Sequence, residues 1–271
     1  MNISGTTRVL SILAHPSSKV TAPCIYNHIF HAMGLDMVYI AHDVRPGAIE
    51  NTLKQFRSWI NLQGFNVTIP HKESACHFVD EMDQIATRIK VINTVSRDPD
   101  GRLKGYNTDG MAAVNAMGDV RGSNCLVIGA GGAARAIIYA LLEKNASHVM
   151  ILNRSETRAR QVMGLFDPGM VSLFHDEMLP AMDFIVQTTP VADSIPFGLD
   201  LSLLKDNVKI LEIVMRKTAL FARAKAMGLC IIPGHAMLYH QTKKNFKIFT
   251  GLDLDTDLLD KAFAEVGYSV T

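Results

Sequence analysis

The stretch Asn124–Lys144, NCLVIGAGGAARAIIYALLEK, joins a continuous apolar run to a glycine-rich turn and a long helical pattern. Gly129, Gly131 and Ala134 form the pattern G-x-G-x-x-A directly after the expected strand Cys125–Ile128. In this setting the first glycine makes a tight turn, and the second lets the backbone approach a pyrophosphate. The N–H groups at the start of the helix then hold the anion. The stretch therefore predicts a dinucleotide-binding unit, which we favour over a turn that serves packing alone.

The end of the next expected strand, Val149–Leu152, indicates which dinucleotide is bound. NAD sites usually carry a carboxylate there to bind the ribose 2′-hydroxyl. This chain instead continues with Asn153, Arg154 and Ser155, and Arg158 follows one helical turn later. Because guanidinium groups pair bidentately with phosphate, the pattern predicts NADP(H). The alternative is that both arginines only line a solvated helix.

On both sides of this stretch, short β-rich runs alternate with helical patterns, which predicts an α/β fold with parallel sheets. After it we expect strands in DFIVQTT (183–189), VKILEIV (208–214) and LCIIP (229–233), and only helices from residue 234 onward. The domain border is expected near Gly110–Gly122. In the first half we expect the strands Val9–Ala14, Met37–Ala41, Gly64–Thr68 and Val91–Ser96. The helices expected there are Pro23–Met33, Ile49–Asn61 and Met82–Lys90. A hairpin is expected in residues 96–106, and a further helix after Asn107.

The composition excludes several classes of protein. The net charge is +1, so a binder of nucleic acid or of a membrane surface, which needs a basic excess, is not expected. No apolar run approaches the roughly 18 residues of a membrane span. The four cysteines are scattered without a C-x-x-C pair, which fits a reducing cytoplasm and predicts neither disulfides nor a metal site.

A lysine follows the strand that ends in NVTIPHKE, residues 66–73. Pro70 cannot donate to a sheet ladder, so the strand must end near it. Strand ends of α/β proteins face the crevice in which ligands bind, which makes Lys72 a candidate catalytic group. Taken alone, Lys72 would be a surface lysine, and Asp109 a helix cap.

Together with the glycine turn, these motifs resemble those of the shikimate dehydrogenase family in order and spacing, from about Pro16 to Gln241. The shared motifs are NVTIPHKE, INTV (92–95), YNTDG (106–110), GAGGAARA (129–136), NRS (153–155) with Arg158, and GHAMLYHQ (234–241). The resemblance implies a substrate domain of residues 1–110, completed by 236–271, and an NADP-binding Rossmann domain of residues 111–235. It places the active-site cleft between the two domains.

The resemblance also implies roles for individual residues. Lys72 would be the catalytic lysine and Asp109 its partner, while Thr68, Asn93 and Gln241 would hydrogen-bond the substrate. In the cofactor site, Gly129, Ala130, Gly131, Gly132 and Ala133 would hold the pyrophosphate, Asn153, Arg154, Ser155 and Arg158 the adenosine phosphate, and Val214 and Gly234 would border the nicotinamide.

The chain departs from the family pattern where the substrate carboxylate is bound. The two serines that precede the family's proline align with Val20 and Ala22, and neither side chain can donate a hydrogen bond. Thr21, Ser17 and Ser18 lie close by but out of register. A substrate tyrosine aligns with Met215, and the asparagine that opens the loop TTPVADS is Thr188. We therefore expect weak activity on shikimate itself.

The expected function is reversible hydride transfer between NADP(H) and a secondary alcohol or ketone of shikimate or a related hydroxy compound. The protein is expected to be a cytoplasmic monomer or homodimer that acts in aromatic amino acid biosynthesis. Two alternatives stay open. One is a sensor that binds NADP(H) and a polyol without turnover. The other is an enzyme such as a methylene-tetrahydrofolate dehydrogenase, against which NTDG argues. His71, His235 and His240 have no carboxylate or cysteine at a matching spacing, so no metal is expected.

Overall fold

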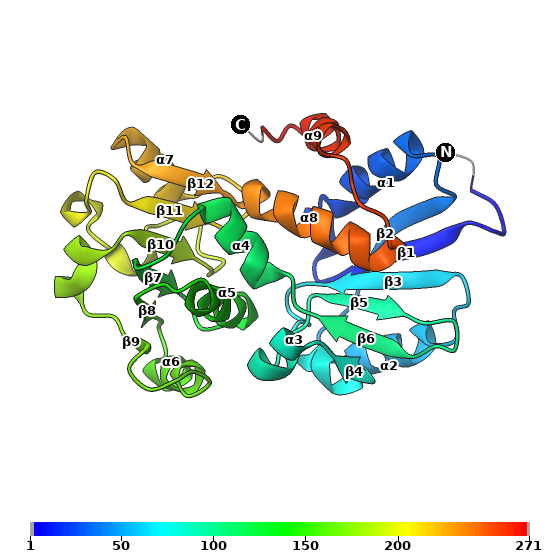
Figure 1. Ribbon diagram of the computed structural model, residues 1–271, viewed down its shortest axis with the longest axis horizontal. Coiled ribbons are helices and arrows are strands. Elements are labelled where there is room, and N and C mark those ends of the chain that lie inside the picture. The colour runs from blue at the N-terminus through cyan, green and yellow to red at the C-terminus, as the bar shows by residue number, and fades with distance from the viewer. Residues whose placement is uncertain (1–2, 270–271) are drawn as a thin grey trace. The chain divides into compact units, whose positions relative to one another are not determined.

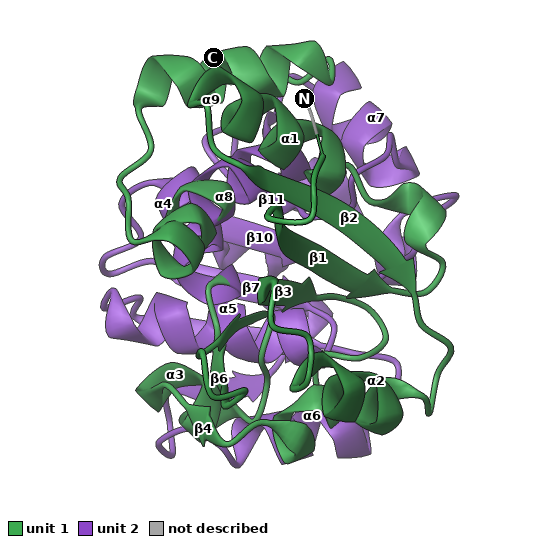
Figure 2. Cartoon of the chain, turned by 90° about the vertical axis from the view of Figure 1, so that its right-hand side faces the viewer, with its two compact units in different colours: residues 1–108, 242–271 green, residues 109–241 purple. Residues whose placement is uncertain are grey.

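A computed structural model of the chain describes residues 3–269 (Figure 1). The chain divides into two compact units: unit 1 is residues 1–108 with 242–271, and unit 2 is residues 109–241 (Figure 2). Helix α8, Gly234–Thr250, contains the second border. The substrate and NADP domains expected from the sequence have nearby borders, and their roles stay a prediction.

Unit 2 is built on a six-stranded parallel sheet in the order β12-β11-β10-β7-β8-β9. Numbered within the unit, this order is 6-5-4-1-2-3, the arrangement of a Rossmann fold, with its switch point between β7 and β10. The strands are β7 (Asn124–Ile128), β8 (His148–Leu152), β9 (Val171–Leu173), β10 (Phe184–Gln187), β11 (Lys209–Glu212) and β12 (Cys230–Pro233), and the helices are α4 (Asp109–Met117), α5 (Gly132–Glu143), α6 (Glu156–Met163) and α7 (Ala219–Ala226).

Strand β7 shows why the strands of this sheet are continuous apolar runs in the sequence. Cys125 and Val127 pack in one core cluster with Ile137 and Leu141 of α5. Leu126 and Ile128, which point to the opposite face, pack in a second cluster with Ile185 and others. A strand buried on both faces has no polar alternation, as expected for a parallel sheet covered on both sides.

Unit 1 contains a second sheet, in the order β2-β1-β3-β5-β6-β4. The expectation of parallel sheets is wrong here, because β3 pairs with β5, and β5 with β6, in antiparallel fashion. The short hairpin in residues 96–106 accounts for the antiparallel pairing of β5 with β6, while β1 pairs with β2 and β3, and β4 with β6, in parallel. The strands are β1 (Arg8–Ala14), β2 (Met37–Asp43), β3 (Leu62–Val67), β4 (Glu81–Met82), β5 (Thr94–Arg97) and β6 (Leu103–Tyr106), and the helices are α1 (Ala22–Ala32), α2 (Ile49–Phe56), α3 (Gln84–Ile89) and α9 (Thr256–Glu265).

The edge strand β2 is covered at one residue by a side chain of α1. The amide of Asn27 accepts from the backbone N–H of Tyr39 (2.8 Å) and donates to its carbonyl (2.9 Å). These are backbone groups of an edge strand, which would otherwise be open to another chain. Asn27 therefore blocks strand addition at this point.

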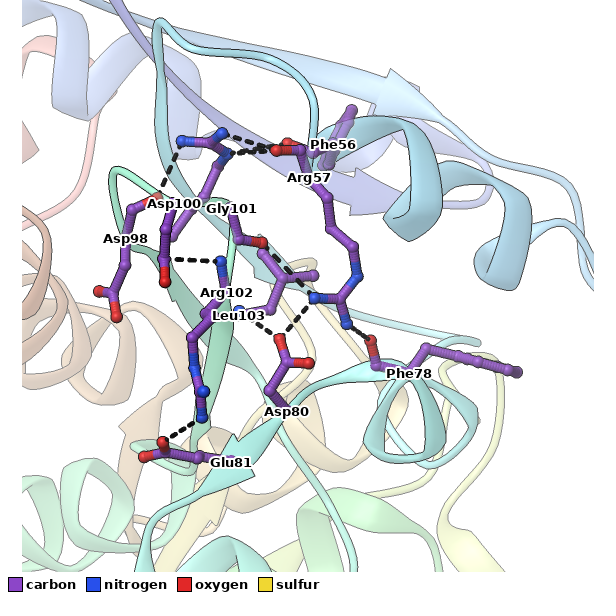
Figure 3. Close-up of polar contacts among 11 residues, drawn as sticks. Phe56, Arg57, Phe78, Asp80, Glu81, Asp98, Asp100, Gly101, Arg102 and Leu103 are labelled. Carbon is purple, nitrogen blue, oxygen red and sulfur yellow. Dashed lines mark hydrogen bonds and ion pairs between the residues drawn. The ribbon is translucent and has the colours of Figure 1, made fainter.

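Helix α2 ends at Phe56, five residues before the predicted end at Asn61. The buried guanidinium of Arg97 donates to the carbonyls of Phe56 (3.0 Å) and Arg57 (2.6 Å). Arg57 in turn donates to Asp80 (2.5 Å) and to the carbonyl of Phe78 (2.9 Å), as Figure 3 shows. Because these side chains take up carbonyls at the helix end, the chain can turn there into β3.

The short strands β4 and β9 were not predicted, and β5 begins three residues later than expected. The other expected helices and strands are present within a few residues. Within residues 3–269, no helix is both long enough and apolar enough to cross a membrane.

Candidate functional site

The glycine turn after β7 permits no side chain at Gly129. Its φ is +119°, and a Cβ atom there would lie 2.3 Å from Oγ1 of Thr188. That hydroxyl donates to the carbonyl of Ile128 (2.7 Å), while the N–H of Gly129 donates to Leu152 (2.8 Å). Thr188, at the end of β10, thus packs the turn from the neighbouring strand. It supplies one hydroxyl donor where the family pattern has asparagine.

The start of α5 suits a pyrophosphate. Gly131 is the N-cap residue, and a Cβ atom there would meet nothing within 4 Å. The space beside its backbone is therefore open to a ligand, and the N–H groups of the first helical turn, from Gly132 onward, favour an anion there. Ala134 is fully buried, which lets the helix pack closely on the sheet. This loop fits a dinucleotide.

The end of β8 carries the arginines expected to select the cofactor. Ser155 caps helix α6, its hydroxyl accepting from the N–H of Arg158 (3.3 Å). The amide of Asn153 donates to the carbonyl of Ser155 (2.9 Å), which closes the turn. Arg154 and Arg158 are exposed, so both guanidinium groups are accessible to a phosphate. The turn contains no carboxylate, and this donor set fits NADP(H).

Residues at the ends of β11 and β12 organise the segment expected to border the nicotinamide. The buried carboxylate of Glu212 accepts from the N–H of Val214 (3.1 Å) and from the hydroxyl of Thr218 (2.8 Å). Desolvation by burial raises the pKa of Glu212 to about 7, although both hydrogen bonds oppose the shift. A Cβ atom at Gly234 would lie 2.8 Å from the carbonyl oxygen of Ile213, so α8 starts directly against this segment. Met215 is exposed.

In unit 1, Lys72 lies in a turn that is anchored on both sides. Before it, Thr68 donates through its N–H to the carbonyl of Leu13 (3.0 Å), and the N–H of His71 donates to Thr68 (2.8 Å). The buried imidazole of His71 hydrogen-bonds the carbonyl of Val44 through Nε2 (2.8 Å), and this nitrogen must donate because a carbonyl only accepts. His71 is therefore a structural anchor for the turn. The half-buried Lys72 is held on a fixed backbone.

The structure brings Lys72, Thr68 and Asn93 together at one end of this sheet. Asn93 accepts through its carbonyl from the N–H of Val67 (2.8 Å), directly before Thr68. The N–H of Ile92, directly before Asn93, donates to the carbonyl of Lys72 (3.1 Å). The three residues thus share the end of the sheet at which β3 stops and β5 begins.

Asp109 and Gln241 belong to unit 2, as its first and last residues. Asp109 is buried at the start of α4, and its Oδ1 accepts from Nε2 of Gln241 (2.5 Å) on α8. The sequence predicted both residues for the site, and the structure joins them to each other. Each is on a helix, so both side chains are held on rigid backbone.

The departures from the family pattern lie after β1. Val20 is half-buried and Ala22 is buried in the first turn of α1. The nearby hydroxyl of Ser17 donates to Asp43 (3.3 Å), which also accepts from the N–H of Ser17 (3.1 Å). The hydroxyl of Thr21 lies 3.5 Å from that of Tyr268. Ser17 and Thr21 are therefore already engaged within unit 1.

The sheet order and glycine turn define a dinucleotide-binding Rossmann protein. Residues 12–95 match the shikimate dehydrogenase substrate binding domain, and residues 111–195 match the shikimate / quinate 5-dehydrogenase family. The chain is 35% identical to the shikimate dehydrogenase (NADP(+)) of Rubrobacter xylanophilus, covering 98% of both chains. It is 32% identical to that of Methanothermobacter thermautotrophicus, over 97% of this chain and 98% of the relative.

Among solved structures, shikimate 5-dehydrogenase from Thermus thermophilus in complex with NADP(H) and shikimate aligns with a TM-score of 0.85 and 30% identity. The alignment covers 96% of this chain and 99% of that one. The chain belongs to the shikimate dehydrogenase family. The family and the two-domain α/β fold predicted from the sequence are thereby confirmed.

Sequence reasoning missed two groups of residues that support these sites. Glu212 was part of an expected strand, and its signal is a carboxylate at the carboxyl end of a buried run. Asn245, Thr108 and Thr94 form a buried polar cluster behind Asn93. The sequence gives no signal for that cluster, because its members lie up to 151 positions apart.

Proposed function

We propose that this chain is an NADP-dependent oxidoreductase of the shikimate dehydrogenase type. It transfers hydride reversibly between NADP(H) and a secondary alcohol or ketone of shikimate or a related hydroxy compound. The observation that carries the proposal is the gathering of Lys72, Thr68 and Asn93 at one end of a sheet, in a chain whose other unit is a Rossmann fold. Bound NADP(H) supplies or accepts the hydride, and the protein supplies orientation and proton transfer.

In the direction of ketone reduction, the ammonium group of Lys72 protonates the forming alkoxide. In the reverse direction its amine removes the hydroxyl proton. The carboxylate of Asp109 accepts from a substrate hydroxyl. Thr68 and Asn93 hydrogen-bond the substrate from unit 1, and Gln241 does so from α8. The anchored turn before Lys72 keeps the amine in place through the reaction.

Unit 2 holds the cofactor. The N–H groups of Gly129 to Ala133 bind the pyrophosphate, where the open space beside Gly131 supports close approach. Arg154 and Arg158 pair with the adenosine phosphate, assisted by Asn153 and Ser155. Val214 and Gly234 border the nicotinamide, with the Val214 backbone fixed by Glu212.

The better substrate is a related hydroxy compound that lacks the carboxylate of shikimate or presents it differently. Val20 and Ala22 offer no hydrogen-bond donor at the family's carboxylate positions. Ser17 cannot readily replace them, because its hydroxyl and its N–H already bond to Asp43. A carboxylate facing these side chains would lose hydration without full compensation. Activity on shikimate is therefore weak, with a high KM.

We also propose a cytoplasmic location, with the enzyme acting as a monomer or homodimer on small molecules. All four cysteines are free, which fits a reducing compartment.

The test is steady-state turnover with NADP+ and a panel of cyclic polyols, shikimate, quinate and neutral sugar alcohols. We expect at least one hydroxy compound to support NADP+ reduction, with shikimate among the poorer ones. Binding of NADP+ and a polyol without turnover of any compound would instead identify a sensor. Efficient turnover of shikimate would retain the enzyme assignment and refute the substrate assignment.

A further inference from the structure

Asn245 lies on α8 within unit 1, and the residue is 3% exposed. Its Oδ1 accepts two hydrogen bonds, one from the hydroxyl of Thr94 (2.9 Å) and one from the hydroxyl of Thr108 (2.8 Å). A buried amide engaged in this way is held in a single orientation.

The orientation passes from Asn245 to Asn93 through Thr108. The N–H of Thr108 can only donate, so the atom of Asn93 facing it (2.8 Å) is the carbonyl oxygen. The amide nitrogen of Asn93 therefore faces the hydroxyl oxygen of Thr108 (2.8 Å), which accepts. The one hydroxyl hydrogen of Thr108 then goes to Asn245 (2.8 Å). In this series of hydrogen bonds, from Asn93 to Thr108 to Asn245, the direction of each donor is fixed by the acceptor that follows it.

Without the oxygen of Asn245, the hydroxyl hydrogens of Thr108 and Thr94 would both lose their acceptor, and that of Thr94 could turn to Oδ1 of Asn93, 3.3 Å away. The amide of Asn93 would then have competing orientations. Thr108 is also the residue directly before Asp109, so its position sets where the backbone leaves unit 1. Asn245 of α8 thus affects the orientation of Asn93 and, through Thr108, the position at which the backbone reaches Asp109.

We propose that Asn245 is a positioning residue for the reaction, which orients the substrate-binding amide of Asn93 through Thr108 and does not itself touch the substrate. This inference rests on the proposed function, because it assigns Asn93 to the substrate. It predicts that loss of the Asn245 oxygen impairs use of the hydroxy substrate and leaves cofactor binding intact.

The principal variant is Asn245→Leu, which keeps the volume and removes the acceptor. We expect kcat/KM for the best hydroxy substrate to fall by about tenfold to a hundredfold, the scale of a misplaced reacting group. The Kd for NADP+ should stay within about twofold, since the nucleotide loop lies in unit 2. Thr108→Val breaks the same chain at its middle and should have a similar effect. The double variant should lose little more than the worse single variant, because both changes remove one shared interaction.

The matched control is Asn27→Ala, which removes two hydrogen bonds between a half-buried amide in the same unit and the backbone of Tyr39. We expect it to lower Tm and to leave kcat/KM at the wild-type value. Equal losses of activity in Asn27→Ala and Asn245→Leu would mean that general destabilisation is the cause, and would overturn the proposal. A wild-type kcat/KM in Asn245→Leu would overturn the proposal as well. If Asn245→Leu does not fold, a wild-type kcat/KM in Thr108→Val would overturn it.

A second readout does not depend on turnover. Hydrogen exchange of the Asn93 side-chain amide, followed by NMR in the free protein, should be faster in Asn245→Leu than in wild type and unchanged in Asn27→Ala. If wild-type protein turned over no hydroxy compound, the proposed function would fail while this exchange measurement still decided whether Asn245 fixes Asn93. Unchanged exchange in Asn245→Leu would refute the positioning role.

Discussion

The backbone N–H of Val214 donates to the buried carboxylate of Glu212 over 3.1 Å, two residues earlier in the chain. The hydroxyl of Thr218 donates to the other carboxylate oxygen and at the same time caps α7 by accepting from Phe221. One side chain thus ties both ends of the segment that is proposed to border the nicotinamide. Because burial raises the pKa of Glu212 to about 7, its charge changes near neutral pH.

This shift predicts how stability depends on pH. Between the ordinary value of 4.5 and about 7, the folded protein keeps a proton on Glu212 that the unfolded chain releases. The free energy of unfolding attributable to this group therefore falls as pH rises through this window. Glu212→Gln cannot ionise, so its Tm relative to wild type should be higher at pH 8 than at pH 5. Calorimetry at both pH values measures this, with the exposed Glu50→Gln as control. An identical difference at both pH values would contradict the prediction.

Replacing the arginines after β8 should weaken binding of NADP+ selectively. Arg154→Ala and Arg158→Ala each remove a charge-assisted bond to the phosphate, worth about 1.5–3 kcal/mol, or roughly tenfold to a hundredfold in Kd. Affinity for NAD+ should change little. Titration calorimetry with both cofactors tests this, and Arg160→Ala is the matched control, since Arg160 on the same helix pairs with Glu156. The assignment is wrong if wild type binds both cofactors equally.

Lys72→Ala should lower kcat by about 10²–10⁴, the range for general acid–base groups. The Kd for NADP+ should not change, because Lys72 belongs to unit 1 and the glycine turn to unit 2. Steady-state kinetics and calorimetry measure the two quantities. Lys54→Ala, an exposed lysine of α2 paired with Glu50, should behave like wild type. Retention of wild-type kcat in Lys72→Ala would rule out its catalytic role.

Restoring two hydroxyl groups after β1 should improve the use of shikimate. Val20→Ser with Ala22→Ser supplies two donors, each worth about 1–3 kcal/mol to a desolvated carboxylate. The double variant should raise kcat/KM for shikimate by about a hundredfold, mainly through KM. The exposed Ser18→Ala is the control and should change nothing. No gain in the double variant would show that the alignment register, or the orientation of the carboxylate, differs from that proposed.

The Rossmann unit was predictable because its signals are local. The apolar strand, glycine turn and helix of residues 124–144 are contiguous, and Gly129 is required by a φ of +119°. The end of α2 was not predictable, because Arg97 captures its carbonyls from 40 positions away. The three residues of β9 offer too little pattern for any assignment.

The residues of the candidate site also differ in whether their sequence signals are local or depend on residues far away in the chain. Lys72, Asp109 and the arginines after β8 lie in contiguous motifs and could be named from the sequence, although their roles stay predictions. Asn245 could not, because an asparagine in a helical pattern gives no sign of the threonines that it faces. The meaning of Glu212 likewise depends on its burial, which a strand pattern alone does not establish.

The bond between Gln241 and Asp109 has an evolutionary consequence. Since the first and last residues of unit 2 meet, the unit is a single insertion whose ends lie side by side, the geometry in which domain insertion is tolerated. Recombination could therefore replace this one contiguous gene segment with that of a relative and leave both flanking segments of unit 1 as they are. On the proposed division of roles, such an exchange would bring the relative's cofactor preference and its counterparts of Asp109 and Gln241, while Lys72, Thr68 and Asn93 stay with unit 1.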